Sequence, residues 1–353
     1  MNENKRKKSI LKVLCSFYVV FILIFLSPTH LKTEAEPFYA KAECVMEMKS
    51  RRILYEHNGE TRLPMASTTK ILTAITVLER CKDLTTPFQI PKEAVGIEGS
   101  SVYLKEGDAY SAIDLLYGLM LRSGNDAATA LALKTSGGIS QFAVEMNEIA
   151  KKAGALNSNF VNPHGLPASN HYTTARDLSY ITCYAMHNST FQKIVNTRFY
   201  EPCAWVNKNK LLKEYAPAVG VKTGYTKEAG RCLVSAANKN DMTLVSTVLS
   251  CADMYNRSKK LFEDCFQTYK MEKIFDKNDV FELKIGEQSI QSNTNTEFYY
   301  PLTEGELEYI EIQTTPNSFS LGEINSKKKG ENIGQIKIYL LKRLIFFGNL
   351  YKL

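Results

Sequence analysis

Polar and apolar residues alternate in two short runs within the first sixty positions. Residues 44–48 (CVMEM) and 52–56 (RILYE) both show the period of two that is typical of a β-strand. Polar residues 49–51 lie between the two runs, and the Asn-Gly pair at 58–59 is a further turn signal. The pattern predicts a β-hairpin over residues 42–57.

A helical period begins after residue 64, where apolar residues recur at spacings of three and four and predict a helix over 67–80. The same period predicts further helices over residues 111–122, 126–133, 140–154 and 174–186. A polar triplet, Ser123-Gly124-Asn125, separates the second of these helices from the third.

Three runs with a β-pattern follow, over residues 219–224, 232–237 and 242–249. A tight turn at 238–241 joins the last two, which favours antiparallel neighbours. A final helix is predicted over 256–269. This part of the chain therefore belongs to the α/β (α+β) class, with an antiparallel sheet flanked by helices.

Beyond residue 271 the pattern becomes β-like throughout. Alternation is clear in residues 280–285, 307–312 and 334–339, and turn-rich connections separate these runs. No set of catalytic residue types gathers there. We therefore predict a main domain over residues 36–271 and a smaller, all-β domain over 272–353.

The end of the chain fits two patterns. With a period of 3.6, Leu340, Leu341, Leu344 and Ile345 form an apolar stripe, which predicts an amphipathic helix lying on a membrane. With a period of two, residues 336–340 alternate and a strand follows a turn. The β-domain needs a closing strand, so the strand is the favoured prediction.

The net charge of +7 belongs in large part to the N-terminus, where Lys5, Arg6, Lys7, Lys8 and Lys12 cluster. This argues against a nucleic-acid partner. An apolar run and a polar segment follow, as in a secretory signal peptide. We predict a signal peptide over residues 1–35, with later cleavage or an uncleaved anchor as alternatives. We therefore predict that the protein is exported and is located at the extracytoplasmic face of the cell membrane or in the cell wall.

The eight cysteines include one in this leader, and no Cys-x-x-Cys pair occurs. Scattered cysteines in apolar settings, such as Cys232, indicate buried thiols rather than a disulfide framework or a zinc site. His164 has no second histidine or carboxylate at ligand spacing. We therefore expect neither a metal nor a cofactor.

Three polar signatures stand in order along the chain: Ser67-Thr68-Thr69-Lys70, Ser123-Gly124-Asn125 and Lys222-Thr223-Gly224. Positions i and i+3 of a helix share a face, so the Ser67 hydroxyl and the Lys70 amine can meet. A serine becomes a nucleophile when a base removes its proton, and a lysine is such a base only if its pKa is lowered. Each signature is weak alone, but their order, spacing and contexts (helix start, turn between helices, strand) together match one family.

The signatures resemble the Ser-x-x-Lys, Ser-Asp-Asn and Lys-Thr-Gly set of class A β-lactamases and penicillin-binding proteins. The sequence is similar to the low-molecular-mass penicillin-binding proteins, the serine-type D-alanyl-D-alanine carboxypeptidases of the peptidase S11 family. Segments 64–70, 162–166, 174–178, 207–212 and 222–226 also look like that family. The resemblance covers about residues 40–270 and implies a β-lactamase/transpeptidase-like catalytic domain. The tail looks like the family's C-terminal domain.

The resemblance implies that a Ser67 acyl-enzyme removes the terminal D-alanine from peptidoglycan stem pentapeptides, and that β-lactams acylate the same serine. It makes Lys70 the base and Ser123 the relay that hands a proton to the leaving amine. The backbone N–H groups of Ser67 and Tyr225 would form the oxyanion hole.

The resemblance also implies a set of substrate-binding residues. Asn125 would hold the peptide by hydrogen bonds, and Lys222 and Thr223 would meet its terminal carboxylate. Gly224 would let the strand approach the substrate closely. Arg257 falls near the position of a family arginine that helps to bind the carboxylate.

Other functions stay open at this stage. A class A β-lactamase would add a glutamate in a Glu-x-x-Leu-Asn segment, and no such segment lies between Asn125 and Lys222. A non-catalytic penicillin-recognising sensor or wall-binding protein would have no need of a nucleophile and base. Transpeptidase or endopeptidase activity would use the same residues.

Overall fold

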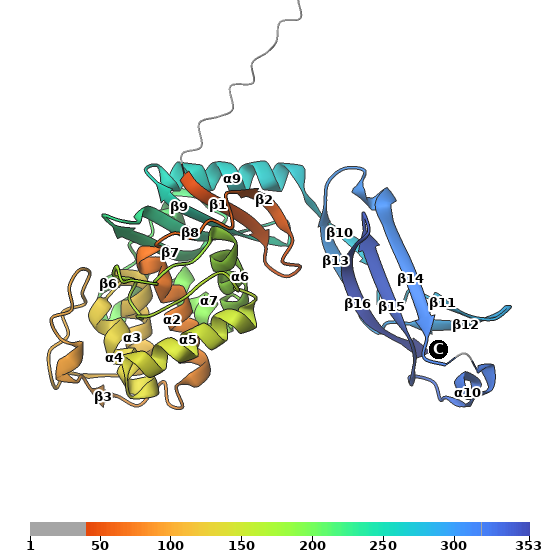
Figure 1. The fold of residues 1–353 in the computed structure, drawn as a ribbon, viewed down its shortest axis with the longest axis horizontal. Helices are drawn as coiled ribbons and strands as arrows, with labels where there is room; N and C mark the ends of the chain where they lie inside the picture. Colours follow the sequence, from red (N-terminus) through yellow and green to blue (C-terminus); the bar gives the residue numbers. More distant parts are fainter. Residues whose placement is uncertain (1–39, 319) are drawn as a thin grey trace, which may run out of the picture. The chain divides into compact units, whose positions relative to one another are not determined.

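The computed structural model describes residues 40–318 and 320–353 (Figure 1). The predicted signal peptide, residues 1–35, lies outside the described residues. Within those two ranges, no helix is both long enough and apolar enough to cross a membrane.

Helices fill most of the chain between the second and the seventh strand, and strands fill most of the rest. The helical elements are η1 (Ala66–Thr69), α2 (Lys70–Arg80), η2 (Lys92–Ala94), α3 (Ala112–Tyr117), η3 (Gly118–Arg122), α4 (Asn125–Ser136), α5 (Ile139–Ala153), α6 (Ala175–Ala185), α7 (Ser189–Asn196), η4 (Glu201–Cys203), α8 (Leu211–Glu214), α9 (Met254–Thr268), η5 (Glu306–Tyr309) and α10 (Leu321–Ser326). The strands are β1 (Ala40–Glu47), β2 (Ile53–His57), β3 (Phe88–Gln89), β4 (Ala109–Tyr110), β5 (Phe199–Tyr200), β6 (Trp205–Val206), β7 (Ala218–Thr226), β8 (Gly230–Lys239), β9 (Met242–Cys251), β10 (Lys270–Phe275), β11 (Phe281–Ile285), β12 (Gln288–Asn293), β13 (Phe298–Leu302), β14 (Ile310–Pro316), β15 (Asn332–Leu340) and β16 (Arg343–Lys352).

The main sheet has five antiparallel strands in the order β2-β1-β9-β8-β7. The predicted hairpin is β1–β2, in which Val45 pairs with Tyr55. The hairpin joins the later strands through β1 and β9, where Val45 pairs with Ser246. Strand β7 is the edge of this sheet, so one side of it is open to other partners.

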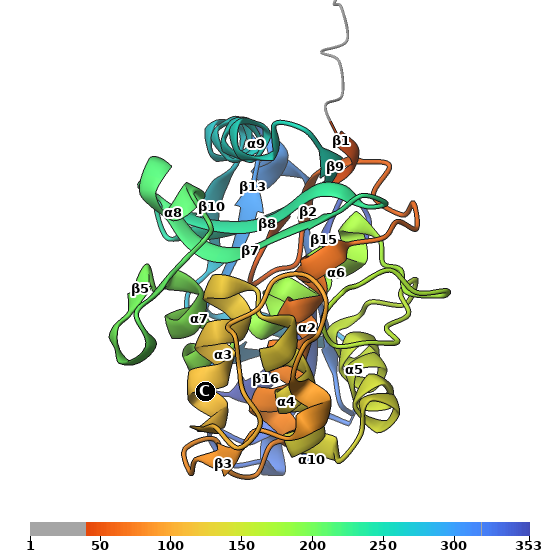
Figure 2. The same cartoon turned by 90° about the vertical axis from the view of Figure 1, so that its left-hand side faces the viewer.

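Alternation along the strands sends side chains into two separate cores. On β1, Cys44 and Met46 belong to a core shared with helices α2 to α7, whereas Val45 belongs to a core shared with α9. Phe262 and Cys265 of α9 fill that second core. In Figures 1 and 2, α9 lies on one face of the sheet and α2 to α7 lie on the other. The sheet is therefore the middle layer, as the predicted class requires.

The polar triplet between the helices forms a sharp turn. The helical stretch that starts with α3 ends in the π-turn η3, and Ser123 follows it in the left-handed conformation, with φ of 66°. Helix α4 begins at Asn125 with Gly124 at its N-cap, one residue before the predicted restart at Asp126. The predicted turn between the two helices is therefore present, and Ser123 lies in it.

Residues beyond 269 form mostly strands, as predicted, with the 3-10 turn η5 and the short helix α10 among them. The predicted β-run over 307–312 becomes a strand only from Ile310, because η5 occupies its start. Five strands make a sheet in the order β11-β12-β16-β15-β14, and β10 pairs with β13. The apolar core includes Leu283, Ile336, Ile338 and Leu350. The predicted boundary after residue 271 falls within β10, and the division into two domains stays a prediction.

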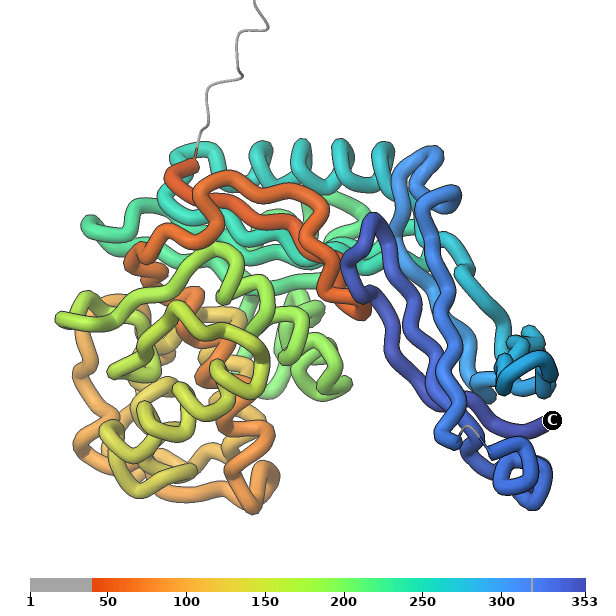
Figure 3. Tube along the Cα trace, turned by 45° about the vertical axis from the view of Figure 1, so that its right-hand side comes forward, coloured from red at the N-terminus to blue at the C-terminus, as the bar shows by residue number. Residues whose placement is uncertain are grey.

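The chain ends in a strand. Residues 343–352 form β16, which pairs with β15 from Asn332↔Tyr351 to Leu340↔Arg343 (Figure 3). The favoured prediction is confirmed, and the alternative of an amphipathic terminal helix is wrong. Tertiary pairing with β15 decides between two patterns that the apolar spacing alone leaves equal.

Candidate active site

The predicted nucleophile lies in a short 3-10 turn that leads into α2. Two threonine hydroxyls hold this turn: Thr68 Oγ1 donates to Met65 O at 2.6 Å and Thr69 Oγ1 donates to Ala66 O at 2.8 Å. Ala66 has a positive φ of 50°, which is unusual for a residue with a side chain. Ser67 is half-buried, and it faces a cleft of about 600 Å³. We call residues 65–69 the nucleophile turn.

The Lys70 amine lies beside Ser67 and is fully buried. Its Nζ is 2.9 Å from Ser67 Oγ, 2.6 Å from Asn125 Oδ1 and 2.6 Å from His164 O. The two 2.6 Å partners are oxygens that only accept. A neutral amine would spend its two N–H groups on them, which leaves its lone pair for the Ser67 hydroxyl.

Electrostatics favour this neutral state. Burial, and next the charge of Lys222, hold the pKa of the Lys70 amine well below its usual range. A buried cation with a second cation nearby is costly, so the proton leaves readily. The arrangement can therefore support removal of the Ser67 proton at ordinary pH.

Lys222 on β7 is the second buried amine, and only 2% of its surface is exposed. Its Nζ donates to the carbonyl of Thr223 at 2.9 Å. Burial, and next the charge of Lys208, lower the pKa of Lys222 to about 7. Its charge therefore changes near neutrality.

The turn at 123–125 forms another wall. Ser123 lines the same cleft as Ser67. Asn125 is buried, and its Nδ2 donates to Glu98 O at 2.5 Å while its Oδ1 accepts from Lys70. Both ends of the Asn125 amide are thus engaged within the protein: Nδ2 with Glu98 O, and Oδ1 with the amine of Lys70, the proposed base.

The opposite wall is β7, whose Thr223, Gly224 and Tyr225 line the cleft. A Cβ at Gly224 would lie 3.1 Å from the backbone nitrogens of Ser67 and Thr68. Glycine therefore allows the close approach of two backbones here, and the expected close approach of β7 to a substrate stays a prediction. Tyr225 is 65% exposed at the mouth of the cleft.

Three cations that motif reasoning did not single out also line the cleft: Lys208, Lys210 and Arg231. Lys208 and Lys210 lie in the family-like segment 207–212, which was the available signal for them. The position of Arg231 in the cleft could not be predicted from the sequence. It depends on the register between β7 and β8, in which Arg231 pairs with Tyr225.

Arg257 is not brought to this cleft with the other predicted residues. It is buried in α9, where its Nε donates to Glu43 Oε1 and its Nη2 to Glu43 Oε2, both at 2.7 Å. Nη2 also donates to the Tyr55 hydroxyl at 3.1 Å. This pairing joins α9 to β1. It corrects the expectation that the Arg257 guanidinium points to a substrate carboxylate.

The family-like turn at 162–166 supports the site from behind. A Cβ at Gly165 would lie 1.9 Å from Ala66 O, so the two backbones touch. His171 receives an N–H from Val161 at Nδ1, so its Nε2 carries the proton and donates to Thr69 Oγ1 at 3.0 Å. Burial, and next the charge of Lys70, lower the pKa of His171 to about 4, so it stays neutral.

Two further sequence-based expectations concern metals and thiols. Among the described residues no group of His, Cys, Asp or Glu side chains is arranged to hold a metal ion. The seven cysteines in this part of the chain are free thiols, and five of them are buried: Cys44, Cys183, Cys232, Cys251 and Cys265. The interpretation of Cys232 as a buried thiol is confirmed.

This chain is similar to known proteins in sequence and in fold. The family profile described as D-alanyl-D-alanine carboxypeptidase, peptidase S11, matches residues 29–253. The D-alanyl-D-alanine carboxypeptidase DacF of Bacillus subtilis (strain 168) is 29% identical over 315 residues, which cover 84% of this chain and 75% of DacF. A D-alanyl-D-alanine carboxypeptidase of Streptomyces sp. (strain K15) is 38% identical over 220 residues, 56% of this chain and 76% of the relative. The crystal structure of penicillin binding protein 5 from Haemophilus influenzae matches with a TM-score of 0.74 and 26% identity, over 89% of this chain and 96% of that chain.

Proposed function

The chain belongs to the peptidase S11 family of D-alanyl-D-alanine carboxypeptidases, and from this premise we propose that Ser67 is its nucleophile. The protein is thus a serine-type carboxypeptidase whose substrate is peptidoglycan and which binds β-lactams. The proposed reaction removes the terminal D-alanine from stem pentapeptides. The observation that carries the assignment is the 2.9 Å contact between Ser67 Oγ and the Lys70 amine.

In the first step, neutral Lys70 accepts the Ser67 proton while Ser67 Oγ attacks the carbonyl carbon of the penultimate D-alanine. The backbone N–H groups of Ser67 and Tyr225 stabilise the oxyanion. The bond to the last D-alanine breaks, and its amine leaves with a proton that Ser123 passes on. A water molecule then hydrolyses the Ser67 ester and releases the shortened peptide.

Recognition of the terminal carboxylate needs a positive charge, and Arg257 is engaged with Glu43. We assign this role to Thr223 and Lys222 together with the cleft cations Lys208, Lys210 and Arg231. Lys222 alone is a weak cation above neutral pH, because its pKa is about 7. Asn125 keeps Lys70 oriented and, through that contact, supports acylation.

The place of action follows from the substrate, since family members work on wall peptidoglycan outside the cytoplasm. We propose that residues 1–35 direct export, either as a cleaved signal peptide or as an anchor. The same proposal includes an association with the membrane through this segment when it is not cleaved.

Covalent labelling by a fluorescent penicillin tests the proposal. We expect wild-type protein and Ser140→Ala, a change at an exposed serine of α5, to be labelled alike. Ser67→Ala should lose both the label and release of D-alanine from a pentapeptide. Label that survives in Ser67→Ala would contradict the assignment. Protein that is labelled yet releases no D-alanine would instead be a penicillin-recognising sensor.

A further inference from the structure

The carboxylate of Asp126 is buried in the first turn of α4, and the proposed mechanism does not use it. Only 1% of Asp126 is exposed. Its Oδ2 accepts from Ser101 Oγ, from the backbone N–H of Val102 at 3.0 Å and from that of Leu104 at 3.1 Å. Its Oδ1 accepts from Val102 N at 3.1 Å and from Ala127 N at 2.9 Å. A buried carboxylate needs donors, and one loop supplies most of them here.

This loop, residues 98–104, also holds Asn125, and we call it the bracing loop. It contains no helix or strand, so side-chain contacts must fix its path. Ser100 O accepts from the backbone N–H of Asn125 at 2.7 Å, and Glu98 O accepts from Asn125 Nδ2 at 2.5 Å. A Cβ at Gly99 would lie 2.9 Å from the same Nδ2. The bracing loop is therefore in direct contact with the Asn125 amide.

Asn125 passes this constraint on to the proposed base. Its Oδ1 accepts from Lys70 Nζ at 2.6 Å, and Nζ lies 2.9 Å from Ser67 Oγ. Hydrogen bonds thus lead from the Asp126 carboxylate to the bracing loop, from the loop to Asn125, and from Asn125 to the Lys70 amine. A misplacement of about 1 Å can slow a reaction about a hundredfold, so the position of the bracing loop matters for the rate.

The charge of Asp126 does not explain why a carboxylate stands at this position. Burial, and next the charge of Lys222, lower the pKa of Lys70, and Lys208 lowers it further. The carboxylate of Asp126 acts in the opposite direction and raises the pKa of Lys70. It therefore opposes the neutral amine that the mechanism needs. The benefit of Asp126 must come from its hydrogen bonds.

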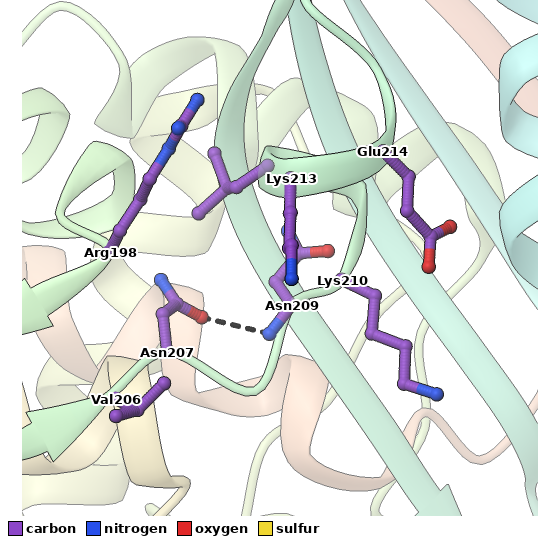
Figure 4. A pocket seen from close by; sticks show the side chains of 8 residues that line it. Arg198, Val206, Asn207, Asn209, Lys210, Lys213 and Glu214 are labelled. Carbon is purple, nitrogen blue, oxygen red and sulfur yellow. Dashed lines mark hydrogen bonds between the residues drawn. The ribbon is translucent and has the colours of Figure 1, made fainter.

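The other titratable groups around Lys70 are cations or neutral rings. Lys208 lies between Asn207 and Asn209, and Figure 4 shows the hydrogen bond in which Asn207 Oδ1 accepts from the backbone N–H of Asn209 at 2.9 Å. Lys208 Nζ lies 3.5 Å from Ser100 Oγ of the bracing loop.

Two histidines also lie close to the Lys70 amine. Burial, and next the charge of Lys70, lower the pKa of His164 and of His171 to about 4, so both rings are neutral near pH 7. Among the groups named here, Asp126 is the one that favours the ammonium form of Lys70.

We propose that Asp126 is a positioning residue for the base: its carboxylate fixes the bracing loop, and the loop holds the Lys70 amine at the Ser67 hydroxyl through Asn125. The proposal rests on the proposed function, in which Lys70 removes the Ser67 proton. Asp126 itself exchanges no proton and touches no substrate.

Asp126→Asn tests the proposal, because asparagine keeps only one acceptor oxygen for the donors of the bracing loop. Labelling rates over a series of penicillin concentrations separate the acylation rate constant from the Kd of the non-covalent complex. We expect the rate constant at the pH optimum to fall by about ten- to a hundredfold, with Kd unchanged. Loss of the charge alone would favour neutral Lys70, so a slower reaction reports lost position.

The matched control is Asp83→Asn. Asp83 Oδ1 also accepts from backbone N–H groups, those of Thr85 and Thr86, both at 3.0 Å, but it braces a different turn. The control should leave the rate constant and Kd unchanged. An Asp126→Asn enzyme that is acylated as fast as wild type, or faster, would overturn the proposal.

A double variant tests whether Asp126 acts through Asn125. Asn125→Ala/Asp126→Asn should be acylated within about twofold of the rate of Asn125→Ala alone, since the link to Lys70 is already broken. Effects that multiply in the double variant would overturn the proposal. Failure of the proposed function looks different, because wild-type protein would then not be labelled at all.

Gly99→Ala keeps the test open if Asp126→Asn does not fold. It leaves the carboxylate intact and presses a methyl group against Asn125 Nδ2, so it should also slow acylation with Kd unchanged. Gly96→Ala is its control, since both glycines have positive φ (91° and 74°) but a Cβ at Gly96 meets nothing within 4 Å. Equal rates in these two variants would overturn the role of the bracing loop.

Discussion

Among the individual residues of this site, two buried lysines have different roles. Lys70 must be neutral to accept a proton, and the burial and the Lys222 charge that lower its pKa also make that state favourable. Lys222 serves as a cation when it is protonated, below its pKa of about 7. A higher pH favours the neutral form of Lys70 but removes the charge of Lys222. The acylation rate should therefore depend on the titration of both amines.

We expect the second-order rate of penicillin acylation to rise with pH as Lys70 loses its proton and to fall above about pH 7 as Lys222 loses its own. Lys222→Arg keeps a positive charge at all these pH values. In that variant the fall at high pH should move upward by more than about one pH unit, since arginine does not titrate there. The measurement is the labelling rate from pH 5 to pH 10.

An unchanged fall at high pH in Lys222→Arg would show that another group controls it. Lys193→Arg is the matched control, because it makes the same exchange on an exposed face of α7. Its pH profile should coincide with that of wild type.

Between elements, the main constraint is the contact of β7 with the nucleophile turn. Gly224→Ala would place a methyl group 3.0 Å from Met65 O and 3.1 Å from Ser67 N. The turn must shift by a few tenths of an ångström, and small misplacement of a nucleophile is costly in rate. We expect acylation to slow by about ten- to a hundredfold, while the melting temperature changes little.

The control for this variant is Gly138→Ala, where a Cβ meets nothing within 4 Å. It should leave the labelling rate unchanged. If Gly224→Ala were labelled as fast as wild type, the close approach of β7 to Ser67 would have no role in positioning the nucleophile.

A second contact between elements is the buried pair that joins Arg257 of α9 to Glu43 of β1. Breaking one partner leaves a buried charge, which typically costs about 3–5 kcal/mol. Arg257→Gln should therefore lower the free energy of unfolding by roughly that amount, with kcat/KM for the folded enzyme unchanged. Urea unfolding and D-alanine release measure the two effects separately.

Arg80→Gln is the comparison, because Arg80 and Glu148 form an exposed pair with side-chain exposures of 45% and 57%. It should cost less than about 1 kcal/mol. If Arg257→Gln instead raised KM strongly and left the free energy of unfolding unchanged, Arg257 would have to contact the substrate.

The sequence allowed most elements to be predicted but few of the contacts between them. Local periods revealed the hairpin, α2, α6 and the strands β7 to β9, because burial of one face imposes a period on the sequence. The three signatures located Ser67, Ser123 and Lys222. What stayed hidden depends on register and packing: Arg231 enters the cleft through its pairing with Tyr225.

Arg257 shows the same limit from the other direction. The family resemblance suggested a substrate contact for this residue, yet its partner Glu43 lies more than two hundred residues earlier in the chain. No local pattern reports such a pairing. The carbonyl of His164 is a third case, since a backbone acceptor for Lys70 leaves no trace in residue type.

At the scale of the whole molecule, the catalytic cleft and the C-terminal sheet depend on different cores. Among the described residues, the buried members of the two cores around the main sheet lie between Ala40 and Cys265. The core of the C-terminal sheet begins at Phe275. A mutation that damages the core of the C-terminal sheet should therefore have only a weak effect on the catalytic cleft.

Strand β16 provides the test, since it lies between β12 and β15 in the C-terminal sheet. Leu350→Ala removes a fully buried side chain from that core and should cost about 2–5 kcal/mol of the sheet's stability. Limited proteolysis should then cut between β11 and β16 while Ser67 is still labelled by penicillin. Phe347→Ala, at a side chain that is 53% exposed on the same strand, should cost less than about 1 kcal/mol. If Leu350→Ala abolished labelling as well, the C-terminal sheet would support the cleft directly; if neither variant increased proteolysis, β16 would not be needed to close the sheet.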